Sequence, residues 1–299
     1  MKVIVQKGIA AGVIVAATGI LITATACIEQ NRTVRMESSV PVSMCQTVAV
    51  FQAELTAKQE AQEVATVIGN MQTVSLASYA ELQDARMLYD NASSAAQAYV
   101  DEGQLLEAEA AYAELEEQRE AMLQLAEESG NLDEILEYAP CHTQASGDAV
   151  LDELVQELVQ KATTDDMTRS EQLKACYTYM VKNYTYGFNY NYQQQGTAKS
   201  VLWATVLLRD GYGACNNWSS AFMYVARALG YETDLYYGAT AAAGGGTTEH
   251  YWPVIRIHDR EYVFDPQVEA DMTRRSGTIA YKRYGIAGSS KYYYQRTVE

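Results

Sequence analysis

The sequence has little proline, glycine and positive charge. With 4 prolines and 19 glycines in 299 residues, it lacks the composition of a long disordered linker or a low-complexity chain. Only 22 lysines and arginines stand against 38 acidic residues, and the net charge of −16 repels nucleic acid. We therefore expect no nucleic-acid partner. Hydrophobic residues make up 48% of the chain, and its length favours two folded units with an appendage.

The N-terminal segment is apolar and carries no acidic residue before position 29. Lys2 and Lys7 precede an apolar run over 8–28, a pattern typical of a secretory signal. The run is also long enough to span a bilayer if it is not cleaved. A third alternative is a lipoprotein signal with Cys27 as the lipidated residue, although an alanine stands three residues earlier, where leucine is usual. The sequence predicts export, with either a membrane tether at the extracytoplasmic face or secretion after cleavage.

The segment over 46–138 is rich in alanine, glutamate, leucine and glutamine and has no proline, which predicts helices. A phrase of the form L-x-x-A-x-x-x-Y occurs twice and continues as an apolar seam in its second copy. Its members are Leu82, Ala85 and Tyr89, then Leu105, Ala108 and Tyr112, with Leu115, Met122 and Ala126 beyond. Such spacing forms one apolar stripe along a helix. Breaks near 69–70, 101–103 and 129–131 predict a small bundle of three or more helices.

Two phrases of this segment resemble the short helical repeats of many bacterial surface proteins. They are A-R-M-L-Y-D at 85–90 and L-x-x-A-E-x-x-Y at 105–112. The resemblance implies a spacer or adhesion module, and a generic helical stalk fits the same pattern. Cys45 and Cys141 flank the segment and are candidates for a disulfide in an oxidising compartment.

A change of composition predicts a domain boundary at Pro140 and the polar stretch 142–148. Helices are expected over 149–162 and 168–183, and short strands over 233–237, 251–258 and 261–264. The last two strands form a hairpin around the polar turn at 258–260. Helices followed by strands indicate an α+β fold, with a nucleophile helix packed on an antiparallel sheet. The expected organisation is a signal or anchor at 1–30, a linker at 31–45, a helical bundle at 46–140 and a catalytic domain at 147–299.

Cys215 is the cysteine whose surroundings indicate chemistry. It follows Gly211 and Gly213 and opens a helix whose buried face is Trp218, Phe222, Val225 and Leu229, with Gly230 at the end. Unpaired amides and the helix dipole favour negative charge at a helix N-terminus, so they stabilise a thiolate. Such a thiolate is a nucleophile when a base stands beside it, and the same amides can stabilise an oxyanion.

His250 is the candidate base, and Asp265 is the candidate carboxylate that orients it. His250 opens a strand after a glycine-rich loop at 244–246, and Asp265 ends the next strand. Antiparallel strands joined near 258–260 bring the two side chains together. A carboxylate bonded to one imidazole nitrogen fixes the tautomer and leaves the other nitrogen to face a thiol.

Four phrases in this order resemble the core of the transglutaminase-like superfamily: G-x-C at 213–215, A-R-A-L-G-Y at 226–231, E-H-Y-W-P-V at 249–254 and Y-V-F-D-P at 262–266. The resemblance extends over about 150–290. It implies a papain/transglutaminase-like fold, a Cys215-His250-Asp265 triad, acyl chemistry on protein or peptide amides, and no cofactor.

Other candidate site residues are aromatic. Trp218, Trp252 and Tyr186 are candidates for substrate binding, and Trp203 is a candidate for the oxyanion site. The tyrosine-rich stretches at 184–192 and 292–294 indicate either a substrate groove or partly exposed packing. Cys176 lies in an amphipathic helix and is expected to be a small buried hydrophobe. Ligand pairs at zinc spacing are absent, so no metal is expected.

Two classes of function remain open. The first is an exported, membrane-tethered cysteine acyltransferase or peptidase that acts on cell-surface protein or wall peptide. The second is a catalytically silent peptide-binding or structural surface module with the same fold. Retention of all three triad residues favours the enzyme.

Overall fold

A computed structural model describes residues 42–70, 73–188, 198–242, 244–287 and 294–296; the side chains of 42–46 and 48 are outside it. The chain divides into two compact units, one ending at Gln59 and the other running from Glu60 to Glu299. Helix α2 (Val42–Asn70) begins in the first unit and ends in the second. The expected signal or anchor, with Cys27, lies outside the described residues. Within the described ranges, no helix combines the length and apolar character needed to cross a membrane.

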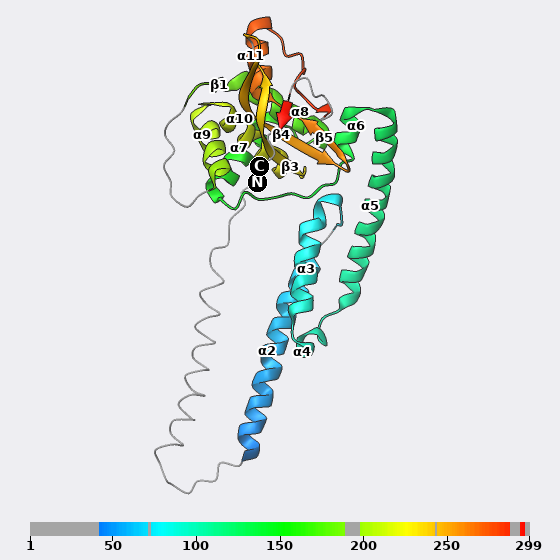
Figure 1. Ribbon diagram of the computed structural model, residues 1–299. Coiled ribbons are helices and arrows are strands. Elements are labelled where there is room, and N and C mark those ends of the chain that lie inside the picture. Colours follow the sequence, from blue (N-terminus) through cyan, green and yellow to red (C-terminus); the bar gives the residue numbers. More distant parts are fainter. Residues whose placement is uncertain (1–41, 71–72, 189–197, 243, 288–293, 297–299) are drawn as a thin grey trace, which may run out of the picture. The chain divides into compact units, whose positions relative to one another are not determined.

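The N-terminal part of the second unit is helical, as the composition predicts. After α2 come the 3-10 turn η1 (Leu76–Ser78) and helices α3 (Tyr79–Asn91), α4 (Ser94–Gln97), α5 (Glu102–Ser129) and α6 (Leu132–Glu137) (Figure 1). The breaks fall where they were expected, for identifiable reasons. Asp101 caps α5 by accepting the Gly103 amide, and Gly130 ends that helix with φ of +69°.

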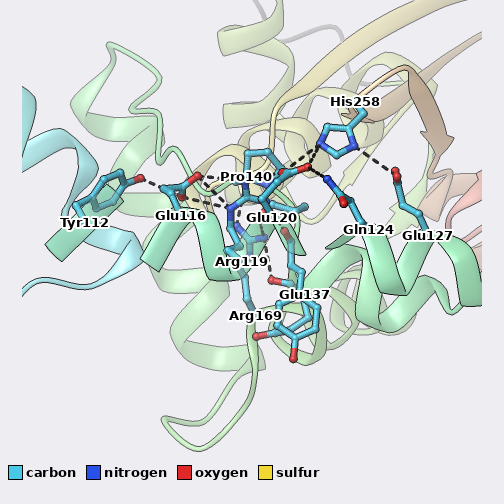
Figure 2. Close-up of polar contacts among 12 residues, drawn as sticks. Tyr112, Glu116, Arg119, Glu120, Gln124, Glu127, Glu137, Pro140, Arg169 and His258 are labelled. Atoms are coloured by element: carbon cyan, nitrogen blue, oxygen red, sulfur yellow. Dashed lines mark hydrogen bonds and ion pairs between the residues drawn. The ribbon is translucent and has the colours of Figure 1, made fainter. Parts of the chain in front are cut away.

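The apolar seam of α5 differs from the sequence prediction beyond Leu115. Met122 is 42% exposed, whereas Arg119 and Leu123 are buried. The buried face of α5 therefore passes through 119, 123 and 126. It includes an arginine, which a search for apolar residues at helical spacing does not find. Arg119 is accommodated because its guanidinium donates to Glu116, Glu120 and the Tyr138 carbonyl (Figure 2).

The C-terminal part of α5 belongs to the core of the α+β domain. Leu123 and Ala126 share one buried cluster with the helices that follow, so this core extends ahead of the boundary expected at 147. Figure 2 shows a polar contact beside it, in which His258 lies between two carboxylates of α5. Its Nε2 is 3.2 Å from Glu120, and its Nδ1 is 3.5 Å from Glu127.

Helix α6 is attached to the rest of the domain by Arg169. The guanidinium donates to the carbonyls of Leu136, Glu137, Ala139 and Pro140. These carbonyls lie at and beyond the end of α6, where no intrahelical partner exists. The arginine also stacks on the Tyr231 ring, with 4.5 Å from Cζ to the ring centroid.

The C-terminal half is built around one central helix, α10 (Cys215–Ala228). Around it lie α7 (Ala149–Ala162), α8 (Arg169–Asn183), α9 (Lys199–Asp210) and α11 (Pro266–Ser276). Trp218, Phe222 and Val225 are fully buried, and Gly230 has φ of +86°. The amphipathic pattern therefore predicted this helix, its buried face and its end correctly. Helices α7 and α8 also occupy the expected ranges, whereas the sequence analysis did not predict α9 and α11.

A five-stranded antiparallel sheet packs on α10 (Figure 1), in the order β6-β5-β4-β3-β7. Its strands are β3 (Thr233–Ala241), β4 (Thr247–Ile257), β5 (Arg260–Val263), β6 (Ile286–Ala287) and β7 (Tyr294–Arg296); β1 (Thr185–Tyr186) and β2 (Tyr212–Gly213) form a separate parallel pair. Because side chains alternate along a strand, Ile255 and Ile257 face α10, while Trp252 and Val254 form a second cluster. The nucleophile helix on an antiparallel sheet confirms the expected fold class.

Candidate active site

Cys215 is the first residue of α10, where the sequence placed it. The amides of the first turn of a helix have no intrahelical partner. Hydrogen bonding from the side chain of His250 and from the backbone of Tyr251 and Asn216 lowers the pKa of the Cys215 thiol. The sulfur therefore lies at a point where hydrogen-bond donors from a helix and a strand converge.

The start of α10 is fixed by Asn217, which is fully buried. Its Oδ1 accepts the Ala214 amide at 2.9 Å, and its Nδ2 donates to the Trp203 carbonyl at 3.0 Å. Gly213 makes this arrangement possible, because a Cβ there would lie 2.5 Å from the Cβ of Asn217. Gly213 lies in β2, and its lack of a side chain allows this close approach of Asn217.

His250 and Asp265 meet as the hairpin predicted. The Nε2 of His250 lies 2.7 Å from the Oδ2 of Asp265, and both residues are buried. Since Nε2 is engaged by the carboxylate, Nδ1 remains for the thiol of Cys215. The geometry therefore brings the three expected residues together in the order Cys215, His250, Asp265.

The electrostatics of the pair favour a thiolate and an imidazolium. Burial is the largest influence on Cys215 and raises the pKa of its thiol, but the hydrogen bond and charge of His250, together with the backbone of Tyr251 and Asn216, outweigh it, so the pKa lies below the ordinary value. Burial likewise lowers the pKa of His250, but the charge and hydrogen bond of Asp265 reverse this and raise it above its ordinary value. Opposite shifts in neighbouring groups are typical of an acid–base pair at a functional site.

Asp265 is held from several sides. Its Oδ1 accepts the Val268 amide at 3.0 Å, which makes it the N-cap of α11, and its backbone amide donates to the Arg283 carbonyl at 2.8 Å. Tyr177 donates from its hydroxyl to the carbonyls of both Asp265 and Arg283. The fully buried Glu269 accepts the Arg283 amide and so fixes that loop.

These supporting residues were not predicted from the sequence. An Asp-Pro pair is a common signal for an N-cap followed by the first helical position, and it would have indicated α11. Tyr177 and Glu269 gave no comparable signal, because each acts on a segment far away along the chain. Tyr294 was also missed, although its hydroxyl donates to Oδ2 of Asp265 at 2.8 Å.

Two aromatic predictions were wrong. Trp218 is 0% exposed and donates from Nε1 to the Gly213 carbonyl, so it is not accessible to a substrate. Trp252 is 1% exposed and packs with Tyr294 at 5.0 Å between ring centroids. Both indoles belong to the interior because each lies on the inward side of its helix or strand.

Tyr186 and Trp203 remain candidates. Tyr186 is 39% exposed, and its pKa is raised first by burial and then by the charge of Cys215. Trp203 is partly buried, with its ring 5.3 Å from that of Tyr251 and its carbonyl bonded to Asn217. Its oxyanion role stays a prediction.

The other cysteines differ from Cys215. Cys176 is fully buried, and burial raises the pKa of its thiol to about 12, which confirms a packing role. Cys141 lies next to Gly230, and the side chain of Cys45 lies outside the described residues, so the Cys45–Cys141 bridge stays a prediction. Among the residues that the structure describes, no group of three or more acidic, histidine or cysteine side chains is placed to hold a metal ion.

A thiol at a helix start beside a histidine–carboxylate pair is the arrangement that a cysteine nucleophile requires. Residues 153–266, which include all three side chains, match the family model described as the transglutaminase-like superfamily. The chain therefore contains a transglutaminase-like domain.

Two solved structures are similar to parts of the chain. One is described as "a Putative Cysteine Protease from Cytophaga hutchinsonii": it has 14% identity and a TM-score of 0.27, covering 40% of this chain and 43% of that one. The other is described as "a TGase", with 16% identity and a TM-score of 0.27, covering 47% of this chain and 35% of that one. The chain thus spans less than half the length of either. The comparison with curated proteins gives no match.

Proposed function

We propose that the chain is an exported cysteine enzyme that performs acyl transfer or hydrolysis on protein or peptide amides through a Cys215-His250-Asp265 triad. The observation that carries the proposal is the placement of Cys215 at the start of α10, bonded to a histidine whose other ring nitrogen lies 2.7 Å from a buried carboxylate. This is the arrangement that a nucleophile, a base and an orienting group require.

In the acylation step, the Cys215 thiolate attacks the amide carbonyl carbon and forms a C–S bond. The carbonyl π electrons move to the oxygen, near the unpaired amides at the start of α10. When the carbonyl re-forms, the C–N bond breaks, and the His250 imidazolium gives its proton to the leaving amine. The product is a thioester on Cys215 and a neutral imidazole, which the hydrogen bond to Asp265 keeps oriented.

The second step decides the reaction class. The neutral His250 takes a proton from an incoming water or amine, which attacks the thioester carbon and releases the Cys215 thiolate. Water gives hydrolysis, and a lysine amine gives an isopeptide crosslink. The same three residues serve both outcomes, so the acceptor distinguishes a peptidase from an acyltransferase.

The proposed place of action is the extracytoplasmic face of the membrane. The apolar run over 8–28 supports export, with Cys27 or the uncleaved run as a tether and secretion as the outcome of cleavage. The proposed partners are therefore the membrane, through this segment, and protein or wall peptide as substrate.

The proposal is tested by alkylation of the full-length chain with iodoacetamide from pH 5 to 10, followed by peptide mapping. A thiol with an ordinary pKa near 8.5 is only about 0.3% ionised at pH 6. Because the pKa of Cys215 is lowered, we expect it to react at pH 6 at least tenfold faster than such a thiol.

His250→Ala is the informative variant and Cys215→Ala the control for peptide assignment. His250→Ala removes the imidazolium, so the Cys215 profile should move toward the ordinary one. Amine-incorporation and peptidase screens then separate crosslinking from hydrolysis. An ordinary profile that is insensitive to His250 would favour the silent peptide-binding module instead.

A further inference from the structure

The carboxylate of Asp265 shares one oxygen between two donors. Oδ2 accepts both the Nε2 of His250 at 2.7 Å and the hydroxyl of Tyr294 at 2.8 Å, while Oδ1 is occupied by the Val268 amide at 3.0 Å. A fully buried carboxylate needs such donors to stay ionised. Tyr294 is therefore bonded to the same atom that orients the proposed base.

The sheet register brings Tyr294 to this position. β7 pairs with β3, with Tyr294 opposite Thr240, and β3 pairs with β4, with Gly238 opposite His250. Positions 238 and 240 point to the same face of the sheet, since side chains alternate. Gly238 adds no side chain between the two, so the tyrosine on one edge strand reaches past β3 toward the histidine on the other side.

The rings around the pair form a small aromatic enclosure. Tyr294 lies 5.0 Å from Trp252 and 6.4 Å from His250, and Trp252 lies 6.4 Å from His250, all between ring centroids. Burial, and then the charge of Asp265, raises the pKa of Tyr294 well above its ordinary range, so the hydroxyl remains a donor. The phenol thus offers a neutral donor in a site from which bulk water is largely excluded.

We propose that Tyr294 is a positioning residue of the triad: its hydroxyl holds Oδ2 of Asp265 and takes up part of the negative charge that would otherwise act on His250 alone. This inference rests on the proposed function of the triad. It assigns to the short strand β7 a part in the active site, in addition to its place at the edge of the sheet.

The sharing of the Asp265 charge between two donors predicts the direction in which the pKa of His250 changes when the Tyr294 hydroxyl is removed. With two donors on Oδ2, the carboxylate stabilises the imidazolium less than it would with one. Without the hydroxyl, the imidazolium of His250 holds its proton more firmly and gives it up less readily to the leaving amine. The tyrosine therefore keeps the pKa of the His250 imidazolium low enough for it to protonate the leaving amine in the acylation step.

The test is Tyr294→Phe, which keeps the ring against Trp252 and removes only the hydroxyl. The titration of His250 is followed by NMR on ¹³C-histidine-labelled full-length protein from pH 5 to 11. The chain has three histidines, so His142→Gln and His258→Gln variants assign the signals. We expect the His250 midpoint to rise by half a pH unit or more, and amide turnover to fall about three- to tenfold.

Tyr284→Phe is the matched control. Tyr284 is a buried tyrosine whose hydroxyl has no hydrogen-bond partner among the described residues, so its removal should leave the His250 midpoint unchanged. An unchanged or lowered midpoint in Tyr294→Phe overturns the inference. If wild-type His250 shows no elevated midpoint and Cys215 reacts as an ordinary thiol, the proposed function itself fails. The two failures are therefore distinguishable.

Discussion

Gly213→Ala is expected to disrupt the start of the nucleophile helix. The added Cβ would lie 2.5 Å from Cβ, 2.8 Å from Cγ and 2.9 Å from Oδ1 of Asn217. Asn217 cannot turn away without a loss, because its amide bonds Ala214 on one side and Trp203 on the other. The substitution therefore either strains the backbone or breaks two buried hydrogen bonds.

Backbone strain and the loss of the hydrogen bonds are expected to lower the free energy of unfolding by similar amounts. Overpacking of a tight interior costs about 1–3 kcal/mol. Leaving buried polar groups unpaired costs about 1–3 kcal/mol for each group. We therefore expect a loss of about 2–5 kcal/mol in the free energy of unfolding. Since Cys215 lies two residues away, displacement of the sulfur by about 1 Å would also slow its chemistry by roughly 100-fold.

The assay combines urea unfolding with the rate of Cys215 alkylation at pH 6. Gly244→Ala is the matched control, because a Cβ at Gly244 meets nothing within 4 Å. It should change the free energy of unfolding by less than about 1 kcal/mol. If Gly213→Ala unfolds at the same urea concentration as the wild type and its Cys215 reacts equally fast, the close approach to Asn217 does not constrain the site.

Three further outcomes follow from the same contacts. Asp265→Asn should lower the pKa of His250, because the carboxylate charge is what raises it. Cys215 alkylation at pH 6 should then slow at least tenfold. An unchanged rate would exclude Asp265 from the triad. Arg169→Met should cost about 2–4 kcal/mol in urea unfolding, since four carbonyls lose a charged donor; a cost below about 0.5 kcal/mol would show that the loss of these bonds is compensated. Cys176, buried with a pKa of about 12, should react with iodoacetamide only when the domain unfolds, and labelling in native buffer at the rate of Cys215 would contradict its burial.

Local patterns predicted much of the C-terminal half. The spacing of Trp218, Phe222 and Val225 identified the face of α10 that is buried, and Cys215 was placed at its first turn. A polar turn at 258–260 identified the hairpin of β4 and β5. These features are local, because helix and strand periods act over a few residues. The same reasoning brought His250 and Asp265 together, since one hairpin connects them.

Errors arose where burial depended on distant segments. Met122 was assigned to the seam of α5, but Arg119 and Leu123 occupy it. The arginine is buried because Glu116 and the Tyr138 carbonyl satisfy it there. A sequence pattern counts charged side chains as exposed, and it cannot detect partners that arrive from a different helix or turn.

Aromatic residues near the nucleophile showed the same difficulty. Trp218 and Trp252 were expected to bind substrate, and both are interior. Tyr294 was assigned to a groove or to packing, and it donates to Asp265. Proximity in the sequence can place a tryptophan near the site, but the direction of its side chain decides whether it faces solvent.

The sequence by itself determined the helix that carries Cys215, the strands that carry His250 and Asp265, and the family resemblance that 153–266 bears out. The tertiary structure decided how these groups are held: by Asn217 across to α9, by Tyr177 and the loop at Arg283, and by Tyr294 from β7. The physical reason is the range of the interactions. Periodicity and capping are set by neighbours in the chain, whereas a buried carboxylate is satisfied by whichever donors the fold brings to it, 29 residues away in the case of Tyr294.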